Sequence, residues 1–158
     1  MFKKLERDEI LSDWDYYQKF VLEALNSSIG AKETIGFSDN AIDKIFKKLT
    51  NPFNTSMQLW IQKSDDLNYV VLTQIQTCEF TQRRSLLWFS ITRARDLDTD
   101  TMIQAYQEGE KELKEFAKDN QCEGISGYSD FEYFAKKVKK DWGAVTRYFF
   151  YLPLQEAA

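Results

Sequence analysis

Three strand-like segments follow one another in the middle of the chain, and they limit its fold more than any other feature of the sequence. They are Met57–Lys63, Tyr69–Phe80 and Ser85–Arg93, separated by polar turns at residues 65–68 and 81–84. Consecutive strands joined by tight turns pair side by side, so we predict an antiparallel meander. The third segment is apolar on both faces at Leu86–Phe89, so we expect it to be covered on both sides.

Two helices are predicted before the meander. Apolar residues recur at helical spacing through Glu9–Ser27, with polar residues between them, which predicts one amphipathic helix. A shorter helix follows, capped by Asp39 or Asn40 and closed by Pro52. Met1–Leu5, ahead of both, is a candidate opening strand.

The longest predicted helix comes after the meander. Asp98 or Thr99 caps it, and it runs to about Asn120. Gly109 lies on its apolar face, where glycine costs about 1 kcal/mol relative to alanine. We therefore expect the helix to approach the sheet closely at this residue. The chain then continues with a short strand Cys122–Tyr128, a short helix Phe131–Lys140 and a final strand Ala144–Leu154.

This order, β-α-α-β-β-β-α-β-α-β, predicts the class of fold. Helices on both sides of a meander indicate a single α/β (α+β) domain over residues 1–158, with a mixed, mostly antiparallel sheet and helices on both faces. In such a sheet we expect Gly124–Tyr128 to lie parallel to Leu86–Thr92.

Composition excludes several classes of function. The chain has no histidine, which removes a Ser-His-Asp triad, a Cys-His pair and a His-ligated zinc site. The net charge of −4 makes nucleic acid an unlikely partner, although lysines gather near the predicted last helix. Asp96, Asp98 and Asp100 lack the glycine and distal glutamate of a calcium loop, so we expect no metal. We expect Cys78 and Cys122 to be buried thiols. We find no secretory signal or membrane span, which favours the cytoplasm.

The order of elements resembles the fold of the GNAT N-acetyltransferases over nearly the whole chain. The C-terminal part carries the resemblance furthest, with the long helix, a strand containing Cys122, a short helix and then Trp142-Gly143-Ala144. The segment Phe116-Ala117-Lys118, with Cys122 and Tyr128-Ser129-Asp130, also resembles small GNAT-like proteins of tailed phages. The resemblance implies acetyl-CoA as the cofactor, seated where the meander and the next strand diverge.

The sequence departs from the family at the turn that precedes the long helix. The resemblance implies an Arg/Gln-x-x-Gly-x-Gly/Ala turn that holds the CoA pyrophosphate on main-chain amides. Residues 93–100 contain no glycine and three aspartates, which we expect to cap the helix and to repel a pyrophosphate. Arg93 and Arg95 remain the candidate cofactor contacts.

The catalytic residues that the resemblance implies are also displaced. The family's tyrosine acid lies four residues before the glycine of the late strand, and counting back from Gly143 reaches Lys139. Tyr128 and Tyr133 are the candidates in its place, and Glu79 is the candidate general base.

From these departures we hypothesise a catalytically degenerate GNAT-fold protein that binds no cofactor and acts through protein–protein contacts, as a component of a phage virion or of its assembly. The alternative is an acetyl-CoA-dependent N-acetyltransferase with divergent cofactor contacts. The expected sheet is truncated after its sixth strand, which leaves an open edge for a protein partner or a second copy. The candidate partner residues are Trp142, Arg147, Tyr148, Phe149, Phe150 and Tyr151.

Overall fold

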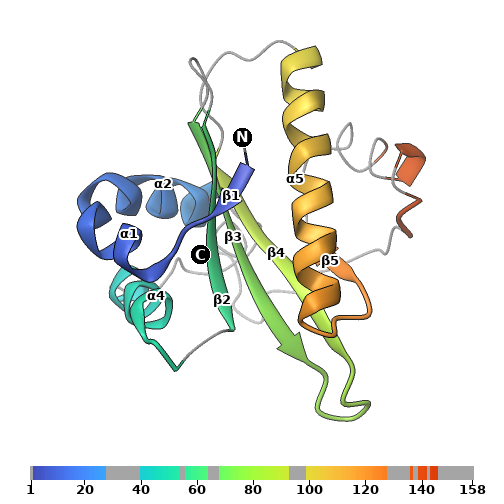
Figure 1. Ribbon diagram of the computed structural model, residues 1–158, viewed down its shortest axis with the longest axis horizontal. Coiled ribbons are helices and arrows are strands. Elements are labelled where there is room, and N and C mark those ends of the chain that lie inside the picture. The colour runs from blue at the N-terminus through green and yellow to red at the C-terminus, as the bar shows by residue number, and fades with distance from the viewer. Residues whose placement is uncertain are drawn as a thin grey trace, which may run out of the picture.

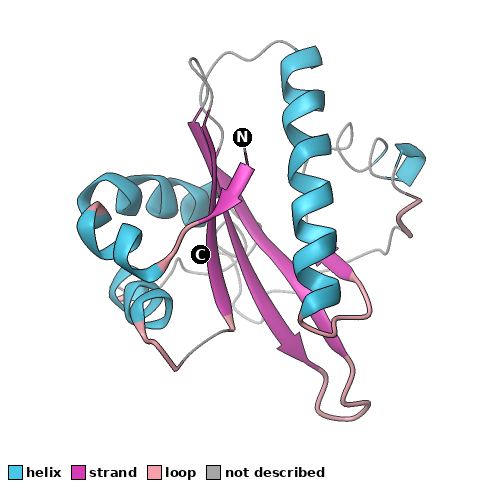
Figure 2. Ribbon diagram, in the orientation of Figure 1, coloured by secondary structure: helices cyan, strands magenta, loops and turns pink. Residues whose placement is uncertain are grey.

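The computed structural model describes residues 2–27, 40–53, 56–63, 68–92, 99–127, 136, 139–141 and 143–145. In this part of the chain, five strands form one sheet in sequence order, and helices cover both of its faces (Figures 1 and 2). The strands are β1 (Phe2–Lys4), β2 (Met57–Lys63), β3 (Asn68–Thr77), β4 (Arg84–Thr92) and β5 (Ile125–Gly127), and the helices are α1 (Arg7–Ser12), α2 (Trp14–Ser27), α4 (Ala41–Thr50) and α5 (Thr99–Asp119).

The strand pairing follows from the lengths of the connections. Strands β1 to β4 are antiparallel neighbours, as predicted for the meander. β5 is parallel to β4, with Leu86 opposite Ile125, because the chain returns through α5 before it joins the sheet. The α+β class, the mixed sheet and the parallel position of β5 are therefore confirmed.

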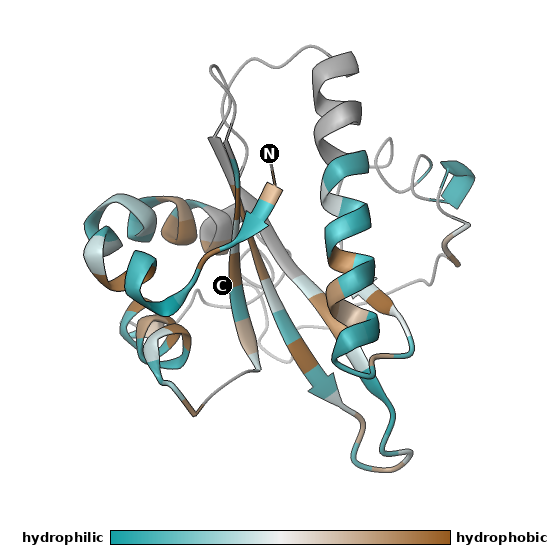
Figure 3. Ribbon diagram, viewed as in Figure 1, coloured by the Kyte–Doolittle hydropathy of each residue, from teal (hydrophilic) through white to brown (hydrophobic). Residues whose placement is uncertain are grey.

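Alternating side chains of the sheet enter two separate cores. Leu59 and Ile61 of β2 are buried on one face with residues of α1, α2 and α4. Trp60, between them, is buried on the other face with residues of β1, β4 and α5. The side chains of β2 thus alternate between the two cores. In Figure 3, the coloured part of α5 is mainly hydrophilic, with a few hydrophobic residues between.

Helix α5 is held on the second core by a few close contacts. Leu113 is almost fully buried, in one cluster with Leu86 of β4. At Gly109, a Cβ atom would lie 3.6 Å from the ring of Phe2, which confirms the close approach expected at this glycine. The same ring stacks on Trp60 with 5.4 Å between ring centroids.

A chain of buried hydrogen bonds crosses the second core. The indole Nε1 of Trp60 donates to Thr73 Oγ1 at 2.8 Å, and this hydroxyl donates to Gln58 Oε1 at 2.9 Å. Thr73 is fully buried, and both of these bonds join the neighbouring strands β2 and β3. Buried polar groups are tolerated when they are bonded in this way, so the network fixes the register of β2 against β3.

The predicted helix Glu9–Ser27 is two helices, because Asp13 ends the first and begins the second. Its backbone has φ −124° and ψ 28°, and its N–H donates to the carbonyl of Glu9 at the end of α1. Its own carbonyl accepts the N–H groups of Tyr16 and Tyr17, which opens α2. The apolar periodicity continues across this break, which explains why the pattern alone predicted one helix.

The predicted ends of the last meander strands were wrong by a few residues. β3 ends at Thr77, and Cys78 begins the turn, where its N–H donates to the carbonyl of Arg83. The turn therefore spans residues 78–83, and Gln82 adopts a left-handed backbone with φ 57°. Of the predicted strand Cys122–Tyr128, only Ile125–Gly127 pairs in the described part of the chain. Residues 136 and 139–141 are helical, and residues 144 and 145 are not in a strand.

Shortening Leu113 tests how α5 is held. Leu113→Ala removes a side chain that is 1% exposed, so we expect a loss of about 2–5 kcal/mol in the free energy of unfolding, measured by urea denaturation. Lys111→Ala, on the exposed side of the same helix, should change it by less than about 0.5 kcal/mol. Equal effects of the two substitutions would contradict this packing of α5.

Candidate functional site

The C-terminal end of β4 carries an irregularity that distinguishes it from the rest of the sheet. Thr73 of β3 pairs with Trp88, whereas the preceding Leu72 pairs with Ser90. Phe89 is therefore an extra residue in β4, which is a β-bulge. Bulges bend a strand and interrupt its ladder, and they occur often beside active sites.

The start of α5 lies at the same end of the sheet as the bulge. β4 ends at Thr92 and α5 begins at Thr99, so residues 93–98 alone connect them (Figure 1). The first N–H groups of a helix have no partner within the helix, and the helix dipole adds partial positive charge there. The first turn of the 21-residue α5 thus lies at the same end of the sheet as the bulge, and the first turn of a helix can bind an anion.

On its other side, β4 pairs with β5 just before the bulge. The pairs run from Leu86 with Ile125 to Trp88 with Gly127, which is the last described residue of β5. The described end of β5 therefore lies beside Trp88 and the bulge, and the candidate acid Tyr128 follows it in the sequence.

The sequence-predicted site residues do not all fall in the described part of the chain. Glu79 does: it lies in the β3–β4 turn, where its side chain is exposed and its carbonyl accepts a bond from Gln82. This turn is at the N-terminal end of β4, which is opposite to the bulge and to the start of α5. Those outside the described residues stay predictions: Arg93, Arg95, Tyr128, Tyr133, Trp142, Arg147, Tyr148, Phe149, Phe150 and Tyr151.

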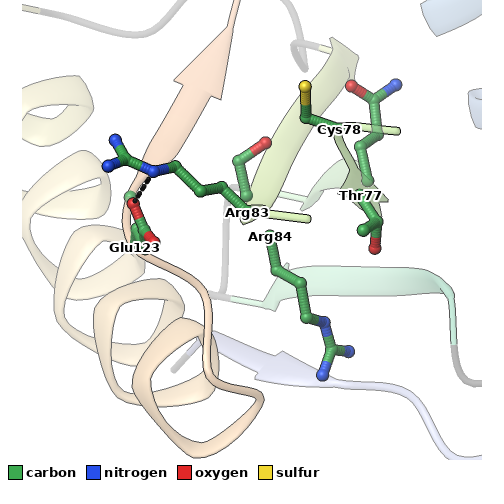
Figure 4. Close-up of a pocket in the computed structure, with 8 residues that line it drawn as sticks. Thr77, Cys78, Arg83, Arg84 and Glu123 are labelled. Carbon is green, nitrogen blue, oxygen red and sulfur yellow. Dashed lines mark ion pairs between the residues drawn. The ribbon is translucent and has the colours of Figure 1, made fainter. Parts of the chain in front are cut away.

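A cavity of about 400 Å³ opens at this opposite end of β4, between the β3–β4 turn and the segment that enters β5 (Figure 4). Arg83 extends from the turn to Glu123, with 3.5 Å between Nε and Oε2. Both side chains are more than half exposed, so this ion pair contributes little to stability. In Figure 4, Arg84, the first residue of β4, points away from Cys78 and Arg83.

The exposed thiol of Cys78 lines this cavity, and its turn favours the thiolate. The hydroxyl and main-chain N–H of Thr81, followed by the main-chain N–H of Phe80 and the charge of Arg83, lower the pKa of Cys78. Burial, by contrast, raises the pKa of Cys122, which is half-buried. Both cysteines are free thiols, as expected, but Cys78 is exposed rather than buried. The special setting of Cys78 was not predicted, because it depends on the geometry of the turn.

Comparisons with known proteins identify solved structures that share this architecture. No family model and no curated protein matches the sequence, but solved structures match over its whole length. A probable acetyltransferase covers 99% of both chains with a TM-score of 0.63 at 9% identity. An aminoglycoside acetyltransferase from an uncultured soil metagenomic sample covers 98% of both chains with a TM-score of 0.64 at 12% identity. A GNAT family acetyltransferase of Staphylococcus aureus covers 97% of this chain and 98% of its own, with a TM-score of 0.50 at 11% identity.

The chain has the GNAT fold. A further match, the ribosomal-protein-alanine N-acetyltransferase of Brucella melitensis biovar Abortus 2308, has a TM-score of 0.55 at 11% identity and covers 97% of this chain and 98% of its own. These likenesses confirm the expected GNAT resemblance, whereas nothing in them supports a phage protein.

The hypothesis of a catalytically degenerate scaffold in a phage virion is contradicted by these matches. Several of the solved structures that match the whole chain are named as acetyltransferases, which favours the alternative of acetyl transfer. The hypothesis relied on the absence of glycine in residues 93–100. Main-chain N–H groups are present at the start of a helix whatever its side chains are. The side chains of residues 93–100 are therefore a weak guide to anion binding.

No helix among the described residues is long and apolar enough to cross a membrane.

The two cysteines provide an internal comparison of thiol reactivity. Because the thiolate is the nucleophile, a lowered pKa lets alkylation of Cys78 reach its plateau at a lower pH than that of Cys122. At neutral pH, iodoacetamide should modify Cys78 first, as measured by peptide mass spectrometry of the folded protein. Equal rates at the two sites across the pH range would show that the turn does not favour the thiolate.

Proposed function

We propose that this protein is an acetyl-CoA-dependent N-acetyltransferase that acetylates an amine. The observation that carries the proposal is the likeness, over the whole chain, to solved acetyltransferases with TM-scores of 0.63 and 0.64. Two further features support it: the bulge at Phe89 and the start of α5 lie at one end of β4.

The cytoplasm is the proposed location, because two free cysteines suit a reducing compartment.

The residues at this end of β4 fit the needs of a coenzyme A thioester. Its pyrophosphate is an anion, for which the main-chain N–H groups in the first turn of α5 can provide donors. Arg93 and Arg95 lie in the connection just before this helix, where a guanidinium forms paired hydrogen bonds with phosphate oxygens. When bound, acetyl-CoA supplies an activated acetyl group, while this chain binds and orients it.

Proton transfer requires a group near the bulge. Tyr128 directly follows β5 in the sequence, and β5 ends beside Trp88 and the bulge, whereas Glu79 lies beyond the other end of β4. β4 spans nine residues, or about 25 Å at the usual strand rise. We therefore favour Tyr128 over Tyr133 as the proton donor, and we assign no proton transfer to Glu79.

Charge substitutions at the two ends of β4 test the site. We expect Arg93→Gln and Arg95→Gln each to weaken acetyl-CoA binding about tenfold, because a hydrogen bond to a charged group contributes about 1.5 kcal/mol. Calorimetric titration measures the dissociation constants directly. Arg83→Gln removes the same charge from the β3–β4 turn and should leave binding unchanged.

Three results would count against the proposal. Failure of the wild-type protein to bind acetyl-CoA would contradict the proposed function itself. Normal binding by both Arg93→Gln and Arg95→Gln would instead contradict the placement of the phosphates. Weaker binding by Arg83→Gln alone would place the anion at the other end of β4.

A further inference from the structure

Gly127 and Trp88 approach each other more closely than two ordinary residues of neighbouring strands. A Cβ atom at Gly127 would lie 3.3 Å from the Cβ of Trp88 and 3.4 Å from its carbonyl oxygen. Both are closer than most real Cβ contacts, and neither atom is the end of a flexible side chain. The absence of a side chain at Gly127 is therefore what permits this spacing.

Trp88 has little freedom to move away from such a contact. On its other side it pairs with Thr73 of β3, whose hydroxyl is fixed by Trp60 and Gln58. The indole of Trp88 packs against the core under α5. A methyl group at Gly127 would consequently displace β5 rather than β4.

The start of β5 is tied to β4 independently of Gly127. The N–H of Leu86 donates to the carbonyl of Gly124 at 3.0 Å, and the N–H of Glu123 donates to the carbonyl of Arg84 at 2.9 Å. With this end held, a displacement at Gly127 would rotate the far end of β5 away from β4. That far end is next to the bulge at Phe89 and leads directly into Tyr128.

We propose that the contact between Gly127 and Trp88 sets the spacing of β4 and β5 at the edge of the acyl-CoA site, so that Gly127 is a positioning residue for the thioester. This inference rests on the proposed function. Trp88 and Gly127 form the last described pair of the β4–β5 ladder, next to the bulge. The spacing of this pair therefore sets how close the end of β5 comes to a thioester bound beside the bulge.

Two glycines of this segment provide a matched test. Gly127→Ala adds a methyl group against Trp88, whereas Gly124→Ala adds the same group where nothing lies within 4 Å. We expect Gly127→Ala to weaken acetyl-CoA binding about tenfold in calorimetry, since small misplacements at a site have large effects. Gly124→Ala should bind as the wild type does.

A stability control separates positioning from general weakening of the fold. Leu49→Ala shortens a buried residue of α4 on the opposite face of the sheet, so it should lower the melting temperature without changing the dissociation constant. The titrations are made at a temperature where circular dichroism shows all four proteins folded. Under these conditions a purely structural role of Gly127 would not alter binding.

The outcomes distinguish this inference from the proposed function. If the wild type does not bind acetyl-CoA, the proposed function fails and the inference fails with it. If the wild type binds and Gly127→Ala binds equally well, or Gly124→Ala is weakened as much, only the inference is overturned. If Gly127→Ala does not fold, hydrogen exchange of the wild type decides: acetyl-CoA should protect amides 88–90 and 125–127, and binding without that protection would overturn the inference.

Discussion

The alternation of buried side chains along β2 and β3 is the constraint on which the rest of this structure depends. Leu59 and Trp60 are adjacent residues, yet each is buried in a different core. One core holds α1, α2 and α4, and the other holds α5. A shift of one residue in the register would exchange the two sets of side chains, so the hydrogen bonds through Thr73 also determine where the helices pack.

The geometry of the candidate site depends on how the helices pack on the two faces of the sheet. Burial of Leu113 with Leu86 fixes α5 along β4, and the short connection then places the start of α5 near the end of that strand. The proposed coenzyme site rests on main-chain features: the N–H groups at the start of α5, the bulge and the described end of the β4–β5 ladder. Main-chain features persist when side chains change, which explains how a fold is shared at 9–12% identity.

The sequence predicted the elements whose signals are local. β2 has its predicted bounds, and the role of Gly109 followed from a glycine on an apolar helix face. The break at Asp13 and the early end of β3 depend on hydrogen bonds within turns, which hydrophobic periodicity does not record. The bulge at Phe89 and the contact of Gly127 with Trp88 were not predicted either, because each depends on how two separate strands pair.

An assay of acetyl transfer tests the central claim most directly. The protein is incubated with acetyl-CoA labelled in its acetyl group and with a mixture of amines that includes aminoglycosides and peptides with an N-terminal alanine, as suggested by the names of the structural neighbours. The account predicts that label appears on at least one amine, at a rate proportional to the protein concentration. Label that remains entirely on coenzyme A, at protein concentrations where calorimetry shows saturated binding, would contradict it.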